Sequence, residues 1–168
     1  MKKPITTIIF VLLSILLGGC SAGCDHTQER PAGQSDVIAL ACDPIPVVRV
    51  GFIGLGMRGI GAVERFDSVA VVALCDLEEA NLARSQAVLR EKSRPKAAEY
   101  TGPDGWKQLC ERRDIDLVYI STDWLSHTPM AVYAMEQGKH VAVEVPAAVT
   151  VEECWKLVDT AEKTRRHC

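Results

Sequence analysis

The chain has 168 residues, 48% of them hydrophobic, and a formal net charge of −3. A length of this order allows one domain with a buried core. The small negative charge and the scattered basic residues argue against nucleic acid as a natural partner. The seven cysteines include no Cys-x-x-Cys pair, so the sequence predicts no metal site.

The N-terminus has the features of a bacterial lipoprotein signal peptide. A short basic start precedes an apolar run from Ile5 to Leu17, which is too short to span a membrane comfortably. The next residues, Gly-Gly-Cys20, complete a pattern that resembles a lipobox. We therefore predict a signal peptide over residues 1–19 and lipidation of Cys20. A secretory signal that is cut near Ala22 is the alternative.

This reading predicts an exported lipoprotein in a Gram-negative bacterium. The expected location is the outer membrane or the cell surface, with the periplasm as the fallback. Contact with the membrane would be through the lipid anchor only. Residues 20–46 are rich in glycine, proline and polar side chains, so we predict that they form a tether.

From Val47 onwards, apolar strand patterns alternate with helical patterns. The predicted strands cover 47–53, 69–75, 97–100, 117–120 and 140–144, and the predicted helices cover 57–66, 78–92, 106–113, 129–137 and a last segment from 151. This alternation is typical of a parallel sheet with right-handed crossovers, so the expected fold is a doubly wound α/β sheet of the Rossmann type. Residues 47–168 would form this domain, and it would be incomplete because the chain stops where a sixth strand is expected.

Two of the helices have clear signals at their ends. Thr150 and Glu153 fit the capping-box pattern at the start of the last helix. Thr128 is expected to cap the preceding helix, with Pro129 at its first position. Gly138 is expected to end that helix, because glycine adopts the left-handed conformation that follows many helices.

A glycine-rich turn, Gly51-Phe-Ile-Gly-Leu-Gly-Met-Arg-Gly59, follows the first predicted strand directly. It fits the pattern G-x-G-x-x-G at Gly54, Gly56 and Gly59. These glycines would allow the tight turn, the approach of a pyrophosphate to the backbone, and close packing of helix on strand, respectively. The helix N-terminus would offer free N–H groups and a positive dipole end to the phosphates. The turn therefore predicts a dinucleotide site.

An acidic residue, Asp76, ends the second predicted strand 20 residues beyond Gly56. Its carboxylate can accept hydrogen bonds from the adenosine ribose hydroxyls, and its charge would repel a 2′-phosphate. The predicted cofactor is therefore NAD rather than NADP. Asp76 and Glu79 also form a capping-box pattern, so an ordinary helix cap is the alternative role.

Several stretches resemble glycoside hydrolase family 109, which lies within the Gfo/Idh/MocA group of nicotinamide-dependent, sugar-active proteins. These stretches are Ala73-Leu-Cys-Asp76, Asp116–Trp124, Ala134–Val141, Glu144-Val-Pro-Ala147 and Trp155–Cys168. The wider group usually carries Glu-Lys-Pro where this chain has Glu144-Val145-Pro146, and that lysine assists proton transfer. The valine therefore argues against an ordinary dehydrogenase.

The resemblance implies a glycosidase that uses NAD to hydrolyse terminal α-linked N-acetylgalactosamine. In the implied chemistry the sugar is oxidised transiently at C3, the glycosidic oxygen leaves by elimination, water adds, and C3 is reduced again. This scheme replaces the carboxylate pair of most glycosidases. The family's catalytic residues and substrate pocket belong to a second α/β domain, so no catalytic residue is assigned here and the 168-residue chain is expected to be inactive.

The resemblance also implies which side chains hold the cofactor. Besides Gly54, Gly56, Gly59 and Asp76, the implied residues are Met57, Arg58, Trp124, Leu125, Ser126, His127, Glu144 and Val145. Met57 and Arg58 would lie against the pyrophosphate, and the others near the nicotinamide half. Two alternative functions stay open, a sugar oxidoreductase and a non-catalytic nucleotide-binding fragment, as does a homo-oligomer of the complete protein.

Overall fold

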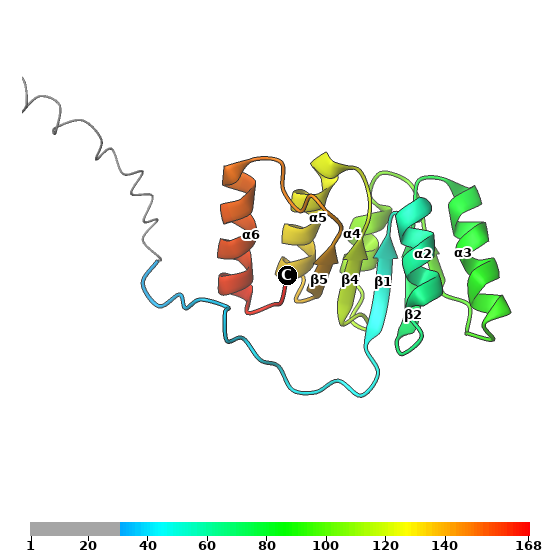
Figure 1. The fold of residues 1–168 in the computed structure, drawn as a ribbon, viewed down its shortest axis with the longest axis horizontal. Coiled ribbons are helices and arrows are strands. Elements are labelled where there is room, and N and C mark those ends of the chain that lie inside the picture. Colours follow the sequence, from blue (N-terminus) through cyan, green and yellow to red (C-terminus); the bar gives the residue numbers. More distant parts are fainter. Residues whose placement is uncertain (1–30) are drawn as a thin grey trace, which may run out of the picture. The chain divides into compact units, whose positions relative to one another are not determined.

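The computed structural model of the chain describes residues 31–168 (Figure 1). The predicted signal peptide and Cys20 lie outside the described residues. Residues 34–168 cluster as one unit. Among the described helices, none has both the length and the apolar character that a membrane span requires.

Five parallel strands form the sheet in the order β3-β2-β1-β4-β5. Their bounds are β1 Arg49–Ile53, β2 Ala70–Cys75, β3 Ala98–Tyr100, β4 Leu117–Ile120 and β5 His140–Val143. The central strand β1 pairs with β2 on one side and with β4 on the other, so the strand order reverses there. In open α/β sheets this reversal opens a ligand-binding crevice at the carboxyl ends of the strands. The expected doubly wound parallel sheet is confirmed.

Helices cover both faces of the sheet (Figure 1). Their bounds are α2 Met57–Arg65, α3 Glu79–Glu91, α4 Gly105–Cys110, α5 Trp124–Glu136 and α6 Val151–Thr164. On one face α2 and α3 pack over β1 and β2, with Phe52, Val63 and Leu89 fully buried. On the other face α4 and α5 pack over the strands, and α6 packs against α5. The two apolar clusters hold the sheet between them, which fixes the strand ends that carry the candidate site.

The predicted helix cap at Thr150 is confirmed, and the predicted cap at Thr128 is wrong. Thr150 accepts from the N–H of Glu153, and the Glu153 side chain accepts from the Thr150 N–H, which is the expected capping box. Helix α5, however, begins at Trp124 and is capped by Asp123. Thr128 therefore lies inside the helix. Its hydroxyl donates to the carbonyl of Ala147 at 3.0 Å, a partner that is remote in sequence.

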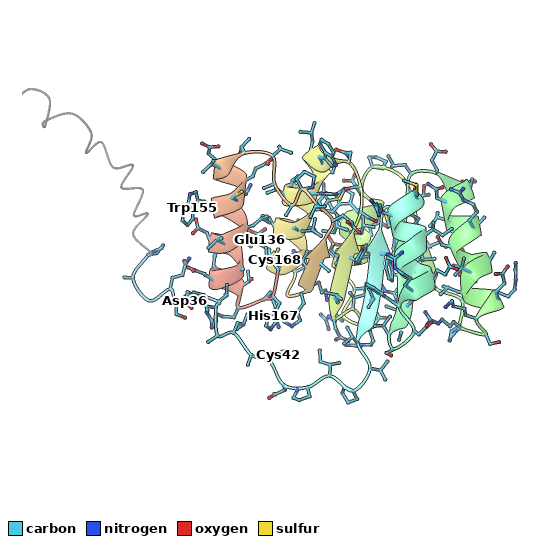
Figure 2. The ribbon with its side chains drawn as sticks, viewed as in Figure 1. Asp36, Cys42, Glu136, Trp155, His167 and Cys168 are labelled. Atoms are coloured by element: carbon cyan, nitrogen blue, oxygen red, sulfur yellow. The ribbon has the colours of Figure 1, made fainter. Side chains whose placement is uncertain are left out.

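Segments that precede and follow the sheet lie beside α6 and β5. The side chain of Gln34 donates to Glu162 at 2.9 Å, and Arg165 donates to the carbonyl of Asp36 at 2.8 Å. Figure 2 shows Asp36 near the C-terminal end of α6. At the other end of the chain, the carbonyl of His167 accepts from the Val141 N–H at 2.8 Å. His167 therefore occupies the edge of β5 that faces away from β4.

Candidate dinucleotide-binding site

Two glycines of the turn after β1 are required by the fold itself. Gly54 has a φ of +83°, in the left-handed region, and a Cβ there would lie 2.5 Å from the carbonyl oxygen of Ser121. A Cβ on Gly59 would lie 1.9 Å from the carbonyl oxygen of Gly54. The Ser121 hydroxyl also donates to that carbonyl at 2.8 Å, which ties the turn to the end of β4. Packing therefore explains both residues without a ligand.

The third glycine, Gly56, has no such explanation within the chain. Its φ is −63°, which any residue adopts, and a Cβ there would meet no atom within 4 Å. Gly56 is the N-cap of α2, and it provides no side chain to bind the free N–H groups of the first turn. This bare helix N-terminus, with open space above it, fits a phosphate group. The site therefore fits a dinucleotide bound through its diphosphate.

Asp76 is held beside this turn by bonds to its carboxylate. One oxygen accepts from the N–H of Leu55 at 2.6 Å, and the other accepts from the N–H of Glu78 at 2.8 Å and from the side chain of Asn81 at 3.1 Å. The predicted capping box with Glu79 is wrong, because Glu78 is the N-cap of α3 and its side chain makes no capping bond. The oxygen that accepts from Leu55 still has one lone pair for a ribose hydroxyl.

Replacement of Asp76 by asparagine is expected to weaken the discrimination between NADH and NADPH. The change removes the negative charge that opposes a 2′-phosphate but keeps the size of the side chain. We expect the ratio of NADPH to NADH affinity to rise about tenfold, to be measured by fluorescence titration. Asp104→Asn, at an exposed ion pair of α4, is the matched control and should leave the ratio unchanged. An unchanged ratio in Asp76→Asn would contradict the assignment.

The four predicted residues from Trp124 to His127 form the first turn of α5 rather than a loop. The side chains of Trp124 and Leu125 are 63% and 73% exposed, at the carboxyl end of β4. The carboxylate of Asp123 accepts from the N–H groups of Leu125 and Ser126 and from the Ser126 hydroxyl. These bonds, above all that from the Ser126 hydroxyl, hold the pKa of Asp123 below its ordinary value.

Replacement of Asp123 by alanine is expected to lower the free energy of unfolding by about 1 kcal/mol, because α5 loses its N-cap. The pKa of Asp123 is lower in the folded than in the unfolded protein. The ionised cap therefore stabilises the fold at pH values above the unfolded pKa of about 3.9, and this stabilisation is lost as the pH falls through the folded-state pKa. Denaturation curves of the two proteins should therefore converge at acidic pH. A constant difference across that range would contradict a role for the charge.

His127 is buried, with 1% of its side chain exposed, and does not line an open cleft. Its Nδ1 lies 2.8 Å from the carbonyl oxygen of Pro146, so Nδ1 carries the proton and donates. This hydrogen bond and the one from Thr128 to Ala147 together connect the segment after β5 to the start of α5. The sequence pattern did not indicate this role, because the backbone carbonyl of a residue 19 positions away leaves no signal in the amino-acid sequence.

Glu144 and Val145 follow β5 and point in different directions. Val145 is 81% exposed, whereas the carboxylate of Glu144 accepts from the hydroxyl of Tyr119 at 2.5 Å. This bond lowers the pKa of Glu144. Burial, and then the bond to Glu144, raise the pKa of Tyr119 to about 12. Nothing in the sequence indicated this role for Tyr119, because the residue occupies one of several positions in an apolar strand.

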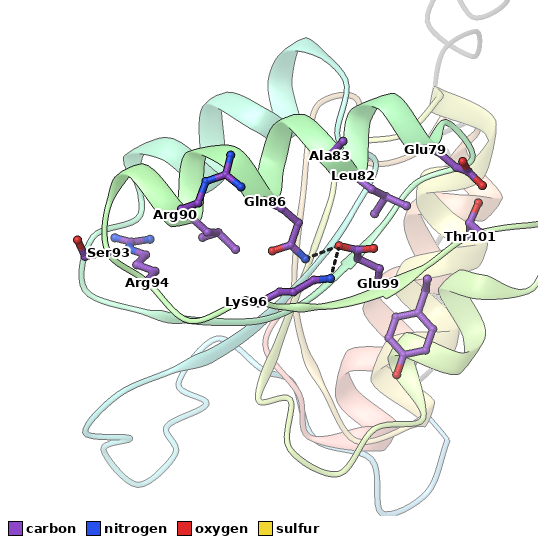
Figure 3. Close-up of a pocket in the computed structure, with 12 residues that line it drawn as sticks. Glu79, Leu82, Ala83, Gln86, Arg90, Ser93, Arg94, Lys96, Glu99 and Thr101 are labelled. Carbon is purple, nitrogen blue, oxygen red and sulfur yellow. Dashed lines mark hydrogen bonds and ion pairs between the residues drawn. The ribbon is translucent and has the colours of Figure 1, made fainter.

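A separate groove of about 1200 Å³ lies between α3 and β3 (Figure 3). Its lining includes Gln86, Lys96 and Glu99, and the side chains of Gln86 and Lys96 both contact the Glu99 carboxylate, at 2.7 Å and 3.6 Å. The lining contains none of the glycines of the turn and does not include Asp76. The turn, with its free helix N-terminus, is therefore the better candidate for the dinucleotide.

Comparisons with known proteins agree with a dinucleotide-binding fold. Residues 48–168 match the family described as GFO_IDH_MocA, "Oxidoreductase family, NAD-binding Rossmann fold". A protein of Bacteroides fragilis named "Alpha-N-acetylgalactosaminidase" is 62% identical over 142 residues, which are 83% of this chain and 33% of the relative. A "Glycosyl hydrolase family 109 protein 1" of Bacteroides thetaiotaomicron is 58% identical over 85% of this chain and 32% of its own length. The chain thus spans about a third of the length of these relatives.

Solved structures share the fold. The WlbA dehydrogenase of Chromobacterium violaceum, solved with NADH and UDP-GlcNAcA, has a TM-score of 0.62 and 24% identity over 76% of this chain and 36% of its own. The myo-inositol dehydrogenase of Lactobacillus casei, solved with NAD(H) and myo-inositol, has a TM-score of 0.57 and 27% identity over 68% of this chain and 33% of its own. The chain belongs to the Gfo/Idh/MocA oxidoreductase family, and its domain is that family's NAD-binding Rossmann fold.

Proposed function

We propose that this chain is the NAD-binding part of a glycosidase that removes terminal α-linked N-acetylgalactosamine. The observation that carries the proposal is the 62% identity to the Bacteroides fragilis relative of that name. The exposed Val145 at the carboxyl end of the sheet supports it, because a valine cannot transfer the proton that a sugar dehydrogenase must remove. The proposed reaction passes through transient oxidation at C3, elimination, addition of water and reduction, with no net redox change.

When NAD is bound, it supplies a hydride acceptor and, once reduced, a hydride donor. The residues of this chain bind and orient it. The N–H groups at the start of α2 and the guanidinium of Arg58 bind the diphosphate, and Asp76 accepts from the adenosine ribose. The exposed side chains of Trp124 and Leu125 cover the nicotinamide end and exclude water. The proton transfers belong to parts of the protein outside this chain.

The experiment uses the complete protein with a 4-nitrophenyl α-N-acetylgalactosaminide and no added NAD. We expect release of nitrophenol with no net NADH, because each oxidation is followed by a reduction at the same carbon. Folded, NAD-loaded protein that releases no nitrophenol would overturn the proposal. The 168-residue chain alone should bind NADH but show no turnover, which separates cofactor binding from catalysis.

A sugar oxidoreductase is the second candidate, favoured by the structural similarity to myo-inositol dehydrogenase. It would accumulate NADH when the complete protein is given NAD and a free sugar. The nitrophenyl substrate and the free sugar therefore separate the two candidates in one series of assays. Net NADH without nitrophenol release would favour the oxidoreductase.

We also propose that the protein is an exported lipoprotein anchored through Cys20, as its first residues predict. Radiolabelled palmitate should be incorporated into the wild type and not into Cys20→Ala. Labelling that persists in the variant would contradict this site. Because NAD is scarce outside the cytoplasm, an exported protein of this kind needs a tightly held cofactor, and purified protein should then retain NAD through extensive dialysis.

A further inference from the structure

Tyr119 and Glu144 form a fixed pair on the α2 side of the sheet, at the carboxyl ends of β4 and β5. Tyr119 is paired in register with Ala142, so Glu144, two residues further along, lies on the same face. The tyrosine hydroxyl donates to the Glu144 carboxylate at 2.5 Å. The ring is 9% exposed and packs on Phe52 and Phe66 with centroid distances of 5.4 Å and 5.5 Å. The ring is held in place, and it fixes the carboxylate.

Two arginines of α2 direct positive charge at this pair. Arg58 lies in the first turn of the helix and Arg65 in the last, and both favour the ionised form of Glu144 electrostatically. Neither arginine takes part in an ion pair within residues 31–168. The guanidinium of Arg65 lies close to Gly61, on its own helix. Arg58 stands beside the bare N-terminus of α2, where the diphosphate is expected.

We propose that Tyr119 is a positioning residue that holds Glu144 away from Arg58 and so leaves the Arg58 guanidinium free for the cofactor diphosphate. The inference rests on the proposed cofactor site. Carboxylate and phosphate are competing partners for a guanidinium, because both accept its paired N–H groups. Without the tyrosine hydroxyl, the Glu144 carboxylate loses its hydrogen-bond donor and turns to the neighbouring cation. The cofactor must then break an ion pair before it binds.

The test measures the affinity of the 168-residue chain for NADH and for ADP-ribose, which has the same diphosphate but no nicotinamide. In Tyr119→Phe both affinities should fall by the same factor, about two- to fivefold, the effect of one exposed ion pair. In a Glu144→Gln background the same substitution should have no effect, because the amide has no charge with which to compete. An Arg58→Gln background should abolish the effect as well.

The chain offers a matched control on the opposite face of the sheet. The hydroxyl of Tyr133 on α5 donates to Glu111 at 2.7 Å, so Tyr133→Phe removes the same kind of bond at a place remote from the glycine-rich turn. This variant should leave both affinities unchanged. Melting temperatures of Tyr119→Phe and the wild type should agree closely, because phenylalanine keeps the ring contacts with Phe52 and Phe66.

Three results would overturn the inference. The first is unchanged affinity in Tyr119→Phe. The second is a loss that persists in the Glu144→Gln background, which would show that Tyr119 acts through packing. The third is a loss for NADH but not for ADP-ribose, which would place the effect at the nicotinamide. Failure of the wild type to bind either ligand would overturn the cofactor site, and this inference with it.

Discussion

Replacement of Gly56 by alanine is expected to weaken NADH binding by about tenfold or more, with almost no change in stability. The added Cβ would meet no protein atom within 4 Å, and the φ of −63° is accessible to alanine. The free energy of unfolding should therefore stay within about 0.5 kcal/mol of the wild type. The methyl group would, however, occupy the space through which a diphosphate approaches the first amides of α2. NADH fluorescence titration and chemical denaturation measure the two quantities separately.

The contrast between binding and stability makes this variant informative. If Gly56→Ala binds NADH as tightly as the wild type, the diphosphate does not lie over this residue, and the assignment of the site is wrong. If the variant is strongly destabilised, the glycine has a packing role that the free space around it does not indicate.

Replacement of Gly59 by alanine, unlike that of Gly56, is expected to affect stability. We expect it to lower the free energy of unfolding by about 2–3 kcal/mol. The new Cβ would lie 1.9 Å from the Gly54 carbonyl oxygen and 2.8 Å from the Ser121 hydroxyl oxygen. The nearer atom belongs to the backbone of a turn that is itself bonded to β4, so helix α2 would have to move away from the strand. Urea denaturation should show a lower midpoint with a similar slope.

Gly61→Ala is the control for this second prediction. Gly61 also lies in α2, but its Cβ would meet only the Arg65 side chain, at 3.0 Å, which can move. Because alanine is a better helix former than glycine, this variant should be as stable as the wild type or more stable. A small effect of Gly59→Ala, equal to that of Gly61→Ala, would refute the packing explanation.

Much of this fold was readable from local sequence patterns. Continuous apolar runs predicted the bounds of the five strands to within one or two residues, because a strand buried under helices on both faces must be apolar along its length. The capping box at Thr150 was correct because its two partners lie only three residues apart. The glycine-rich turn predicted the dinucleotide site for a similar reason, because its conformation depends on residues that are adjacent in the chain.

The helix caps that were predicted wrongly involve side chains with distant partners. Thr128 looked like a cap, but its hydroxyl binds the carbonyl of Ala147, and Asp123 caps the helix instead. Asp76 looked like a cap as well, yet one of its oxygens binds the N–H of Leu55 on the neighbouring turn. Thr128 therefore binds a distant partner in place of the local one, whereas Asp76 keeps a local bond from the Glu78 N–H and adds the distant one.

Local sequence patterns were enough to predict the order of strands and helices along the chain, the family and the position of the glycine-rich turn. Which side chains meet at the carboxyl ends of the strands depends on how the strands are arranged in the sheet. The pair of Tyr119 and Glu144 is the clearest case, because the two residues come from different strands and have no local pattern in common. The physical reason is that periodicity and capping are properties of neighbouring residues, whereas the contacts across the sheet depend on strand order and register.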